Sequence, residues 1–240
     1  MFQKVQGIVL SCVDYNDRYL FVQIYTDSLG RATYLLPRVT GKTSKLKKAL
    51  FSPLSVLDMD VEHRPARDIQ RIREAHPAFP LYAISCNLSK ASMAFFLSEF
   101  LSKILRDVNE NNNLFRYLLH SVEILEYTEK SIANYHLVFM MGLARYLGFY
   151  PNLENCRPGV WFDMLNGMYV DRKPLHNHYI SGDESIALSK LHRISYENMH
   201  LFRFSRRDRN NIVNRILEYY RIHLHDFPAI KSLDVLHELF

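Results

Sequence analysis

The chain has 240 residues, of which 48% are hydrophobic and 13% aromatic, which is enough apolar material for one large globular domain or two modest ones. Its formal net charge at pH 7 is +5, and most of the excess lies in residues 1–80, which carry twelve Lys and Arg against eight Asp and Glu. This asymmetry favours a polyanionic partner for the N-terminal third, although a solvated basic face without a partner would give the same counts.

Cysteine usage and hydropathy indicate the compartment. Cys12, Cys86 and Cys156 are far apart and form no C-x-x-C pair, which favours a reducing environment without disulfides. We expect no signal peptide, because the first apolar run is short and lacks a small-residue cleavage site. The most apolar segment, residues 93–105, is interrupted by polar residues and is shorter than the roughly 20 residues that a bilayer span requires. We therefore expect a cytoplasmic protein without a membrane helix.

Residues 1–80 predict a small β-barrel. In residues 17–26, for example, Leu20, Val22 and Ile24 share one face of a strand. Strands are expected over residues 5–13, 17–26, 31–36, 57–62 and 68–75, with Gly7 as a bulge in the first. Five short strands in so few residues suit a closed barrel better than an open sheet, because closure removes the exposed edges.

A basic segment connects the third and fourth of these strands. Residues 31–50 contain no acidic residue, and fixed positive charge in a connection of this kind attracts a phosphate backbone. The predicted DNA-binding residues are Arg31, Arg38, Lys42, Lys45, Lys47 and Lys48.

The same segment is not a nucleotide-binding loop. Gly41-Lys42-Thr43 resembles the end of a P-loop, but that motif requires a glycine where this sequence has Leu36. A nucleophile elbow, an H-E-x-x-H zinc motif and a dinucleotide-binding glycine pattern are also missing from the sequence. We expect neither an enzyme nor a cofactor.

Beyond residue 80 the apolar spacing becomes that of helices. Helices are expected over residues 93–105, from an N-cap at Asn113 to residue 125, from about residue 131 to Gly148, from a capping box at residues 205–208 to residue 224, and near residues 231–239. Asn166-Gly167 between apolar flanks predicts a β-hairpin over residues 161–170. The expected fold class is α+β: a five-stranded barrel in residues 1–80, then a mainly helical domain in residues 81–240 with an inserted hairpin.

Two histidine pairs allow two interpretations. His176 and His178, like His223 and His225, are spaced two apart, which in a strand places both on one side of a metal. No cysteine or further histidine cluster completes either set, and the second pair is expected on a helix, where positions i and i+2 diverge. Ordinary surface histidines are the preferred interpretation.

A second basic cluster and the barrel aromatics also have alternatives. Near the start of the helix expected at residue 205, the cluster could bind a DNA phosphate or a partner's carboxylate, or it could pair with the domain's own acids. Its members are Arg203, Arg206, Arg207 and Arg209. Aromatic residues of the barrel could stack on unpaired bases, or they could fill the core or face a neighbouring domain. These are Tyr19, Phe21, Tyr25 and Tyr34.

With these residues in view, the chain resembles the RecO family of bacterial recombination mediators over essentially its whole length. Each matching segment is loose alone, and their order and spacing are the specific part. They are residues 7–10 (GIVL), 15–18 (YNDR), 26–31 (TDSLGR), the basic segment 38–48, residues 54–58 (LSVLD), 147–151 (LGFYP) and 231–236 (KSLDVL).

The resemblance implies a function as well as a fold. It implies an N-terminal OB-fold and a C-terminal helical domain, binding of single- and double-stranded DNA, and annealing of complementary strands. It also implies contacts with RecR and with the C-terminal tail of single-stranded DNA-binding protein, and indirect help in loading RecA at the nucleoid. The expected function is therefore a non-enzymatic mediator of DNA repair and recombination.

One departure from the family concerns zinc. Many members carry four cysteines after the Leu-Gly-x-x-Pro segment, and here only Cys156 remains. One thiolate cannot complete a tetrahedral site, so we expect no structural zinc in the degenerate zinc-finger-like region near residues 151–180. Packing of Trp161, Phe162 and Tyr169 is expected to hold it instead.

Two other classes of function stay open on the sequence alone. The chain could be an OB-fold adaptor that binds RNA or protein, which competition between RNA and single-stranded DNA would reveal. It could also be a nucleic-acid-processing enzyme, which product analysis with a divalent metal would reveal.

Overall fold

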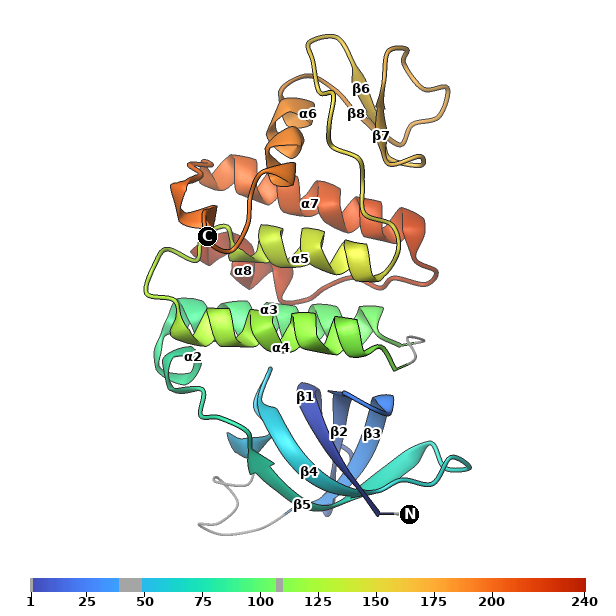
Figure 1. The fold of residues 1–240 in the computed structure, drawn as a ribbon, viewed down its shortest axis with the longest axis vertical. Helices are drawn as coiled ribbons and strands as arrows, with labels where there is room; N and C mark the ends of the chain where they lie inside the picture. The colour runs from blue at the N-terminus through green and yellow to red at the C-terminus, as the bar shows by residue number, and fades with distance from the viewer. Residues whose placement is uncertain (1, 39–48, 107–109) are drawn as a thin grey trace. The chain divides into compact units, whose positions relative to one another are not determined.

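The computed structural model describes residues 2–38, 49–106 and 110–240 (Figure 1). The chain divides into two compact units. The first comprises Met1–Tyr127 with Ile230–Leu233, and the second Thr128–Ala229 with Asp234–Phe240. In the parts described, no helix is long and apolar enough to cross a membrane.

The first unit begins with a closed five-stranded barrel. Its strands are β1 (Phe2–Asp14), β2 (Tyr19–Thr26), β3 (Gly30–Pro37), β4 (Val56–Glu62) and β5 (Ile69–Pro77). They pair in the order β1-β2-β3-β5-β4, antiparallel except for the parallel pair of β3 and β5. This confirms the predicted barrel, and each strand lies within a few residues of its expected bounds.

The barrel interior is filled by alternate side chains of its strands. Val22, Ile24 and Tyr34 are fully buried there, so their neighbours in sequence point to the outer face. The expectation of a bulge at Gly7 is wrong: the register of β1 shifts between Val9 and Ser11. A Cβ at Gly7 would overlap Ile24 and come within 2.8 Å of the Met59 side chain, so this position lacks a side chain because the interior has no room for one.

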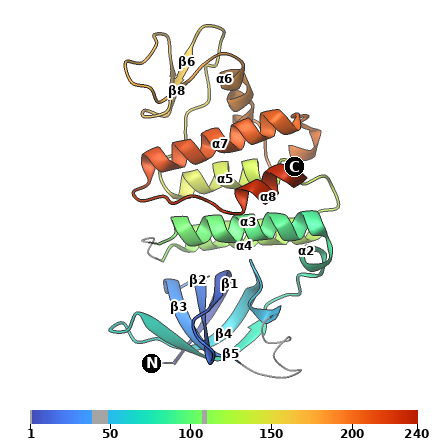
Figure 2. The same ribbon diagram turned by 180° about the vertical axis from the view of Figure 1, so that it is seen from behind.

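Helices α2 (Tyr82–Cys86), α3 (Leu88–Ile104) and α4 (Asn112–Tyr127) complete the first unit, and α3 and α4 lie side by side (Figures 1 and 2). The Ser98 hydroxyl on α3 donates to the Leu10 carbonyl on β1. Helix α4 is not capped by Asn113 as expected: Asn111 accepts a hydrogen bond from the Leu114 amide at 3.0 Å, which places the cap two residues earlier. The five-residue helix α2 is too short to give a periodic signal in the sequence.

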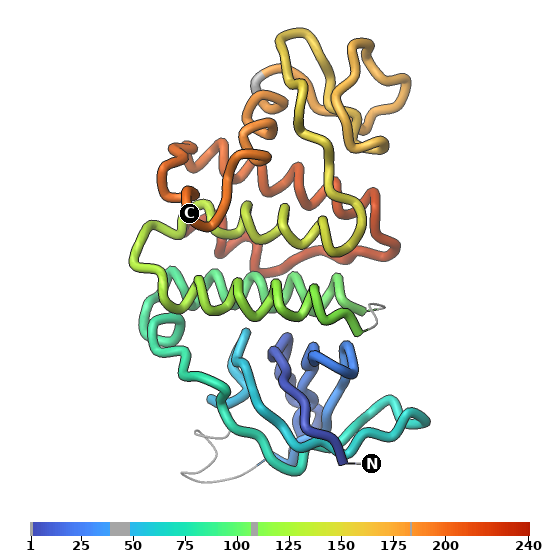
Figure 3. Tube along the Cα trace, viewed as in Figure 1, coloured from blue at the N-terminus to red at the C-terminus, as the bar shows by residue number. Residues whose placement is uncertain are grey.

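The second unit is mainly helical and contains a small sheet in the order β7-β6-β8; its path can be followed in Figure 3. Its elements are α5 (Tyr135–Tyr146), β6 (Trp161–Asp163), β7 (Met168–Val170), β8 (Tyr179–Ile180), α6 (Gly182–Ser189), the 3-10 turns η1 (Lys190–His192) and η2 (Met199–Leu201), α7 (Arg206–His223) and α8 (Leu233–Leu239). The predicted hairpin is confirmed as β6 and β7, and the capping box before α7 is complete between Ser205 and Asp208. The short strand β8 and helix α6 were not predicted.

Two sequence predictions in this unit need correction. Helix α5 begins at Tyr135 rather than near residue 131, and the preceding Asn134 uses its side-chain amide to donate to the carbonyls of Met199 and Phe202. His223 is the last residue of α7 and His225 lies beyond it, so the two do not share a helix. The expected end of α5 is confirmed by Gly148, whose φ of +84° lies in the left-handed region.

Glu99 on α3 holds the segment Ile230–Leu233 within the first unit. Its carboxylate accepts hydrogen bonds from the Lys231 amide at 2.9 Å and from the Ser232 amide at 2.8 Å, and it pairs with Lys103 at 2.7 Å. Burial opposes ionisation of Glu99, but the hydrogen bonds from Lys103, Ser232 and Lys231 outweigh it and lower its pKa to about 2.

We predict that Glu99→Gln lowers the free energy of unfolding by about 2–3 kcal/mol at pH 7. A carboxyl group whose pKa is depressed stabilises the fold above its ordinary pKa of 4.5 and loses that contribution as the pH falls towards 2. The difference between wild type and variant should therefore shrink across this interval. Urea denaturation at a series of pH values measures it, with exposed Glu110→Gln as the control. A difference of the same size at pH 7 and pH 3 would contradict the assignment.

Candidate nucleic-acid interface

The outer face of β1, β2 and β3 carries a polar row of side chains next to an apolar row. Because the strands are paired in register, the neighbours across them are fixed: Ser11, Gln23 and Thr33 in the polar row, and Val13, Phe21 and Leu35 in the apolar row. The Ser11 hydroxyl donates to the Gln23 side chain at 3.1 Å. All six side chains are partly or fully accessible. This face offers both hydrogen-bonding groups and apolar surface to a ligand.

Exposed aromatic rings lie at the turn between β1 and β2. Tyr15 is 58% exposed, and the centre of its ring is 4.2 Å from that of Phe21. Tyr19 is also exposed, and the side chain of Asn16 fixes the turn by accepting from the Arg18 and Tyr19 amides, each at 2.9 Å. Such rings are platforms on which a base can stack. Tyr15 was not among the predicted aromatics, although it lies in the segment YNDR that carries the family resemblance.

The other two predicted aromatics are buried. Tyr34 lies in the barrel core, and Tyr25 stacks against Phe115 of α4 with 6.5 Å between ring centres. Burial also raises the pKa of Tyr25 to about 12. These two residues therefore serve packing, the alternative that the sequence left open.

Arg38 is held at the same turn. Its amide donates to the Arg18 carbonyl at 2.7 Å, and its guanidinium pairs with Asp14 at 2.5 Å. Arg18 is exposed, and sequence reasoning did not single it out. The end of β3 and the β1–β2 turn therefore bring two arginines next to the exposed rings, and the two acids of the same turn, Asp14 and Asp17, partly offset their charge.

The remaining predicted residues of this site have different positions. Arg31 lies on β3, two residues from Thr33 and on the same face, and is half-buried. Lys42, Lys45, Lys47 and Lys48, with the P-loop-like residues 41–43, lie outside the described residues.

In the second unit, two arginines of the predicted cluster bind backbone carbonyls and the other two are exposed. Arg206 donates to the His237 carbonyl at 2.7 Å, and Arg209 donates to the carbonyls of Phe204 at 2.6 Å and Phe240 at 3.0 Å. These two side chains therefore hold the end of α8, where carbonyls lack helical partners. Arg203 and Arg207 are exposed.

Arg207 lines a polar pocket of about 340 Å³ between α6 and α7. Its other lining residues are Glu184, Ala187, Leu188, Asp208, Asn211, Ile212 and Arg215. Arg215 is paired with Glu184 at 2.8 Å and Glu218 at 2.9 Å, so Arg207 is the cation of this pocket that is better placed for a new anionic partner.

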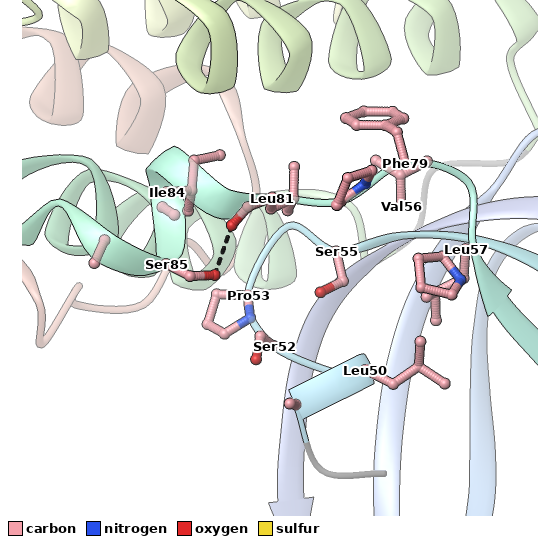
Figure 4. A pocket seen from close by; sticks show the side chains of 15 residues that line it. Leu50, Ser52, Pro53, Ser55, Val56, Leu57, Phe79, Leu81, Ile84 and Ser85 are labelled. Atoms are coloured by element: carbon pink, nitrogen blue, oxygen red, sulfur yellow. Dashed lines mark hydrogen bonds between the residues drawn. The ribbon is translucent and has the colours of Figure 1, made fainter. Parts of the chain in front are cut away.

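A second pocket, of about 370 Å³, lies in the first unit (Figure 4). It is formed by residues 49–57, the end of β5, and helices α2 and α3, with Pro53, Phe79, Leu81 and Ile84 in its wall. None of its described lining residues is charged. It is therefore suited to apolar contact rather than to phosphate binding or acid–base chemistry.

The region expected to lack zinc is held by hydrogen bonds as well as packing. Buried Phe162 meets Tyr169 edge to face with 5.2 Å between ring centres. Asp163 accepts from the Leu165 amide at 2.9 Å and lies 3.3 Å from Nε2 of His176. Burial would raise the pKa of Asp163, but hydrogen bonds from Asn166 and Leu165 hold it below its ordinary value.

The donor groups in this region do not fit a zinc site. The Cys156 thiol is 3.8 Å from the Ser185 carbonyl, and Nδ1 of His176 accepts from the His178 amide at 3.2 Å. Within the described ranges no three His, Cys, Asp or Glu side chains form a cluster that could hold a metal ion. The absence of structural zinc stays a prediction.

Comparison of the sequence with known proteins identifies the family of this chain. The family described as "Recombination protein O N terminal" matches residues 1–80, and "Recombination protein O C terminal" matches residues 87–234. The proteins named "DNA repair protein RecO" from Azobacteroides pseudotrichonymphae and Phocaeicola vulgatus are 41% and 44% identical over 240 residues, the full length of both chains in each case. The protein of that name from Bacteroides fragilis is 44% identical over the full length of both. The chain therefore belongs to the RecO family.

Proposed function

We propose that the chain is a non-enzymatic mediator of DNA repair and recombination that binds single- and double-stranded DNA and anneals complementary strands. The proposal rests on the convergence of exposed Tyr15 and half-buried Phe21 with Arg18 and Arg38 at one turn of the barrel. The lysine-rich segment follows Arg38 directly in the sequence. Membership of the RecO family supports the same proposal.

The chemistry of this interface is backbone neutralisation combined with stacking. Cations of the basic segment bind phosphates, and such contacts carry no sequence information. Bases stack on Tyr15 and Phe21, which accept any base because every base has a π-face. A DNA strand held in this way keeps its base edges free, so it can search for the register of a complementary DNA strand. Binding is therefore tolerant of sequence and sensitive to salt.

Protein partners complete the proposal. RecR and the C-terminal tail of single-stranded DNA-binding protein would act with the chain to load RecA, in the cytoplasm at the nucleoid. Of the predicted cluster, Arg207 is our proposed contact for an acidic tail, because it lines an open pocket while Arg206 and Arg209 hold α8. Titration of Arg207→Ala with a tail peptide and with DNA separately tests this assignment.

We predict that reversing the charge of the lysine segment, as Lys42→Glu/Lys45→Glu/Lys47→Glu, weakens binding of single-stranded DNA and reduces its salt dependence. Contact with about five phosphates gives a log–log salt slope near −3.5, and each lost contact removes about 0.7. The slope of the triple variant should be about −1.4. Fluorescence anisotropy across a salt series measures both quantities.

The matched control places three charge reversals at exposed positions outside the barrel, Arg116→Glu/Lys130→Glu/Arg172→Glu. It changes the net charge equally and should leave the slope near that of the wild type. Equal slopes for the wild type and the lysine variant would remove these residues from the interface.

We predict a different signature for the aromatic rings. Replacing Tyr15 or Phe21 by alanine should weaken binding by about 1–3 kcal/mol for each base that loses its stacking partner. The salt slope should not change, because no phosphate contact is lost. Tyr82→Ala, at a ring that is 73% exposed on α2, is the control. Wild-type affinity in Tyr15→Ala/Phe21→Ala would show that bases do not stack at this turn.

A further inference from the structure

The connection between β4 and β5 is an ordered hairpin loop fixed from inside by one buried side chain. Gln70 is 4% exposed, and its side-chain oxygen accepts from the Arg64 amide at 2.9 Å. Its side-chain nitrogen donates to the Arg64 carbonyl at 3.0 Å and also to the Arg67 carbonyl. The Arg67 amide closes the turn by donating to the Arg64 carbonyl at 2.9 Å. The backbone from which Arg64 and Arg67 project is therefore fixed before any ligand binds.

This hairpin carries more positive than negative charge. Arg64 donates to Glu62 at 2.7 Å. That hydrogen bond, followed by the positive charges of Arg64, Arg67 and Arg71, lowers the pKa of Glu62 against the effect of burial. Arg67 and Arg71 are exposed, and neither guanidinium forms a hydrogen bond or ion pair with the residues that the structure describes. Asp68 is the other acid of the loop, which leaves a net positive tip.

The hairpin borders the outer face of the barrel described above. Ile69, at the start of β5, pairs with Thr33 of β3, and Thr33 pairs with Gln23 of β2. Ile69 is 42% exposed, so accessible surface continues from the polar row to the hairpin. Arg31 lies on β3 two residues before Thr33. Because β3 and β5 are parallel, this places Arg31 at the end of β3 that is next to the hairpin.

Acidic residues limit the path of a polyanion on the other side of the hairpin. Asp58 and Asp60 occupy the outer face of β4, and Glu74 is opposite Asp60 on β5. These carboxylates repel a phosphate backbone that runs along β4. A DNA strand that contacts the hairpin is therefore directed across β3 and β2, towards the turn that carries Tyr15 and Phe21.

We propose that Arg67 and Arg71 form a second phosphate-binding site, which contacts the backbone of a single strand lying across β2 and β3 and held at its other end by the β1–β2 turn. Guanidinium groups bind phosphate oxygens through paired N–H donors, and a fixed loop loses less conformational entropy on binding. Gln70 is the positioning residue of this site. The inference rests on the proposed function, because it assigns a second contact to the same bound DNA.

The test compares Arg67→Gln/Arg71→Gln with Arg116→Gln/Arg172→Gln, which removes two positive charges from exposed positions elsewhere. Oligothymidylate binding is measured across a salt series. Loss of two contacts should reduce the magnitude of the slope by about 1.4 and weaken binding roughly 25-fold at 0.1 M salt, while the control should match the wild type. Arg67→Lys/Arg71→Lys keeps both charges and should recover most of the slope, which a folding defect would not allow.

Other outcomes are equally decisive. If the wild type binds oligothymidylate and the hairpin variant binds it with the same slope, the second site is wrong and the proposed function stands. If the wild type does not bind oligothymidylate, both the second site and the proposed function are wrong. If the hairpin variant keeps DNA binding but loses binding of a polyglutamate peptide that the wild type binds, the hairpin is a protein contact and the assignment to DNA is overturned.

Discussion

The barrel closes through a short parallel pairing of β3 with β5, and the accessible face depends on that closure. The pair joins Thr33 to Ile69 and Tyr34 to Gln70. Tyr34 fills the interior, and each large side chain buried there contributes about 1.5–3 kcal/mol that would be lost if the barrel opened. Gln70, the partner of Tyr34 on β5, fixes the β4–β5 hairpin. The same pairing therefore completes the core and positions the basic loop beside the outer face.

The alternation of the strands converts this packing into a binding surface. Because successive side chains point to opposite faces, burial of Val22 and Ile24 obliges Phe21 and Gln23 to face outward, and a slip of one residue would exchange the two sets. Phe115 of α4 covers the end of this face at Tyr25. The accessible part therefore runs from the row of Ser11, Gln23 and Thr33, which borders the β4–β5 hairpin at Ile69, to the β1–β2 turn.

Much of this fold follows from local patterns, and what does not follow depends on distant contacts. Period-two alternation located the five strands, but a glycine in a strand has more than one explanation, and Gly7 is required by close packing rather than by a bulge. Tyr25 shares a strand face with Phe21 but is buried, and Phe115, which is remote in the sequence, packs on it. The bonds of Arg206 to α8 and of Gln70 within its hairpin are likewise tertiary, so the sequence could not distinguish anchoring arginines from accessible ones.

We propose that this barrel face holds single DNA strands in a state in which they can pair. A strand-annealing assay with complementary oligonucleotides, one of them labelled, tests it most directly, with and without single-stranded DNA-binding protein on the strands. We predict that the chain accelerates annealing of bare strands, that the acceleration persists on protein-coated strands, and that rising salt suppresses both. Annealing at the spontaneous rate in both conditions, at concentrations where the chain is bound to the DNA, would contradict it.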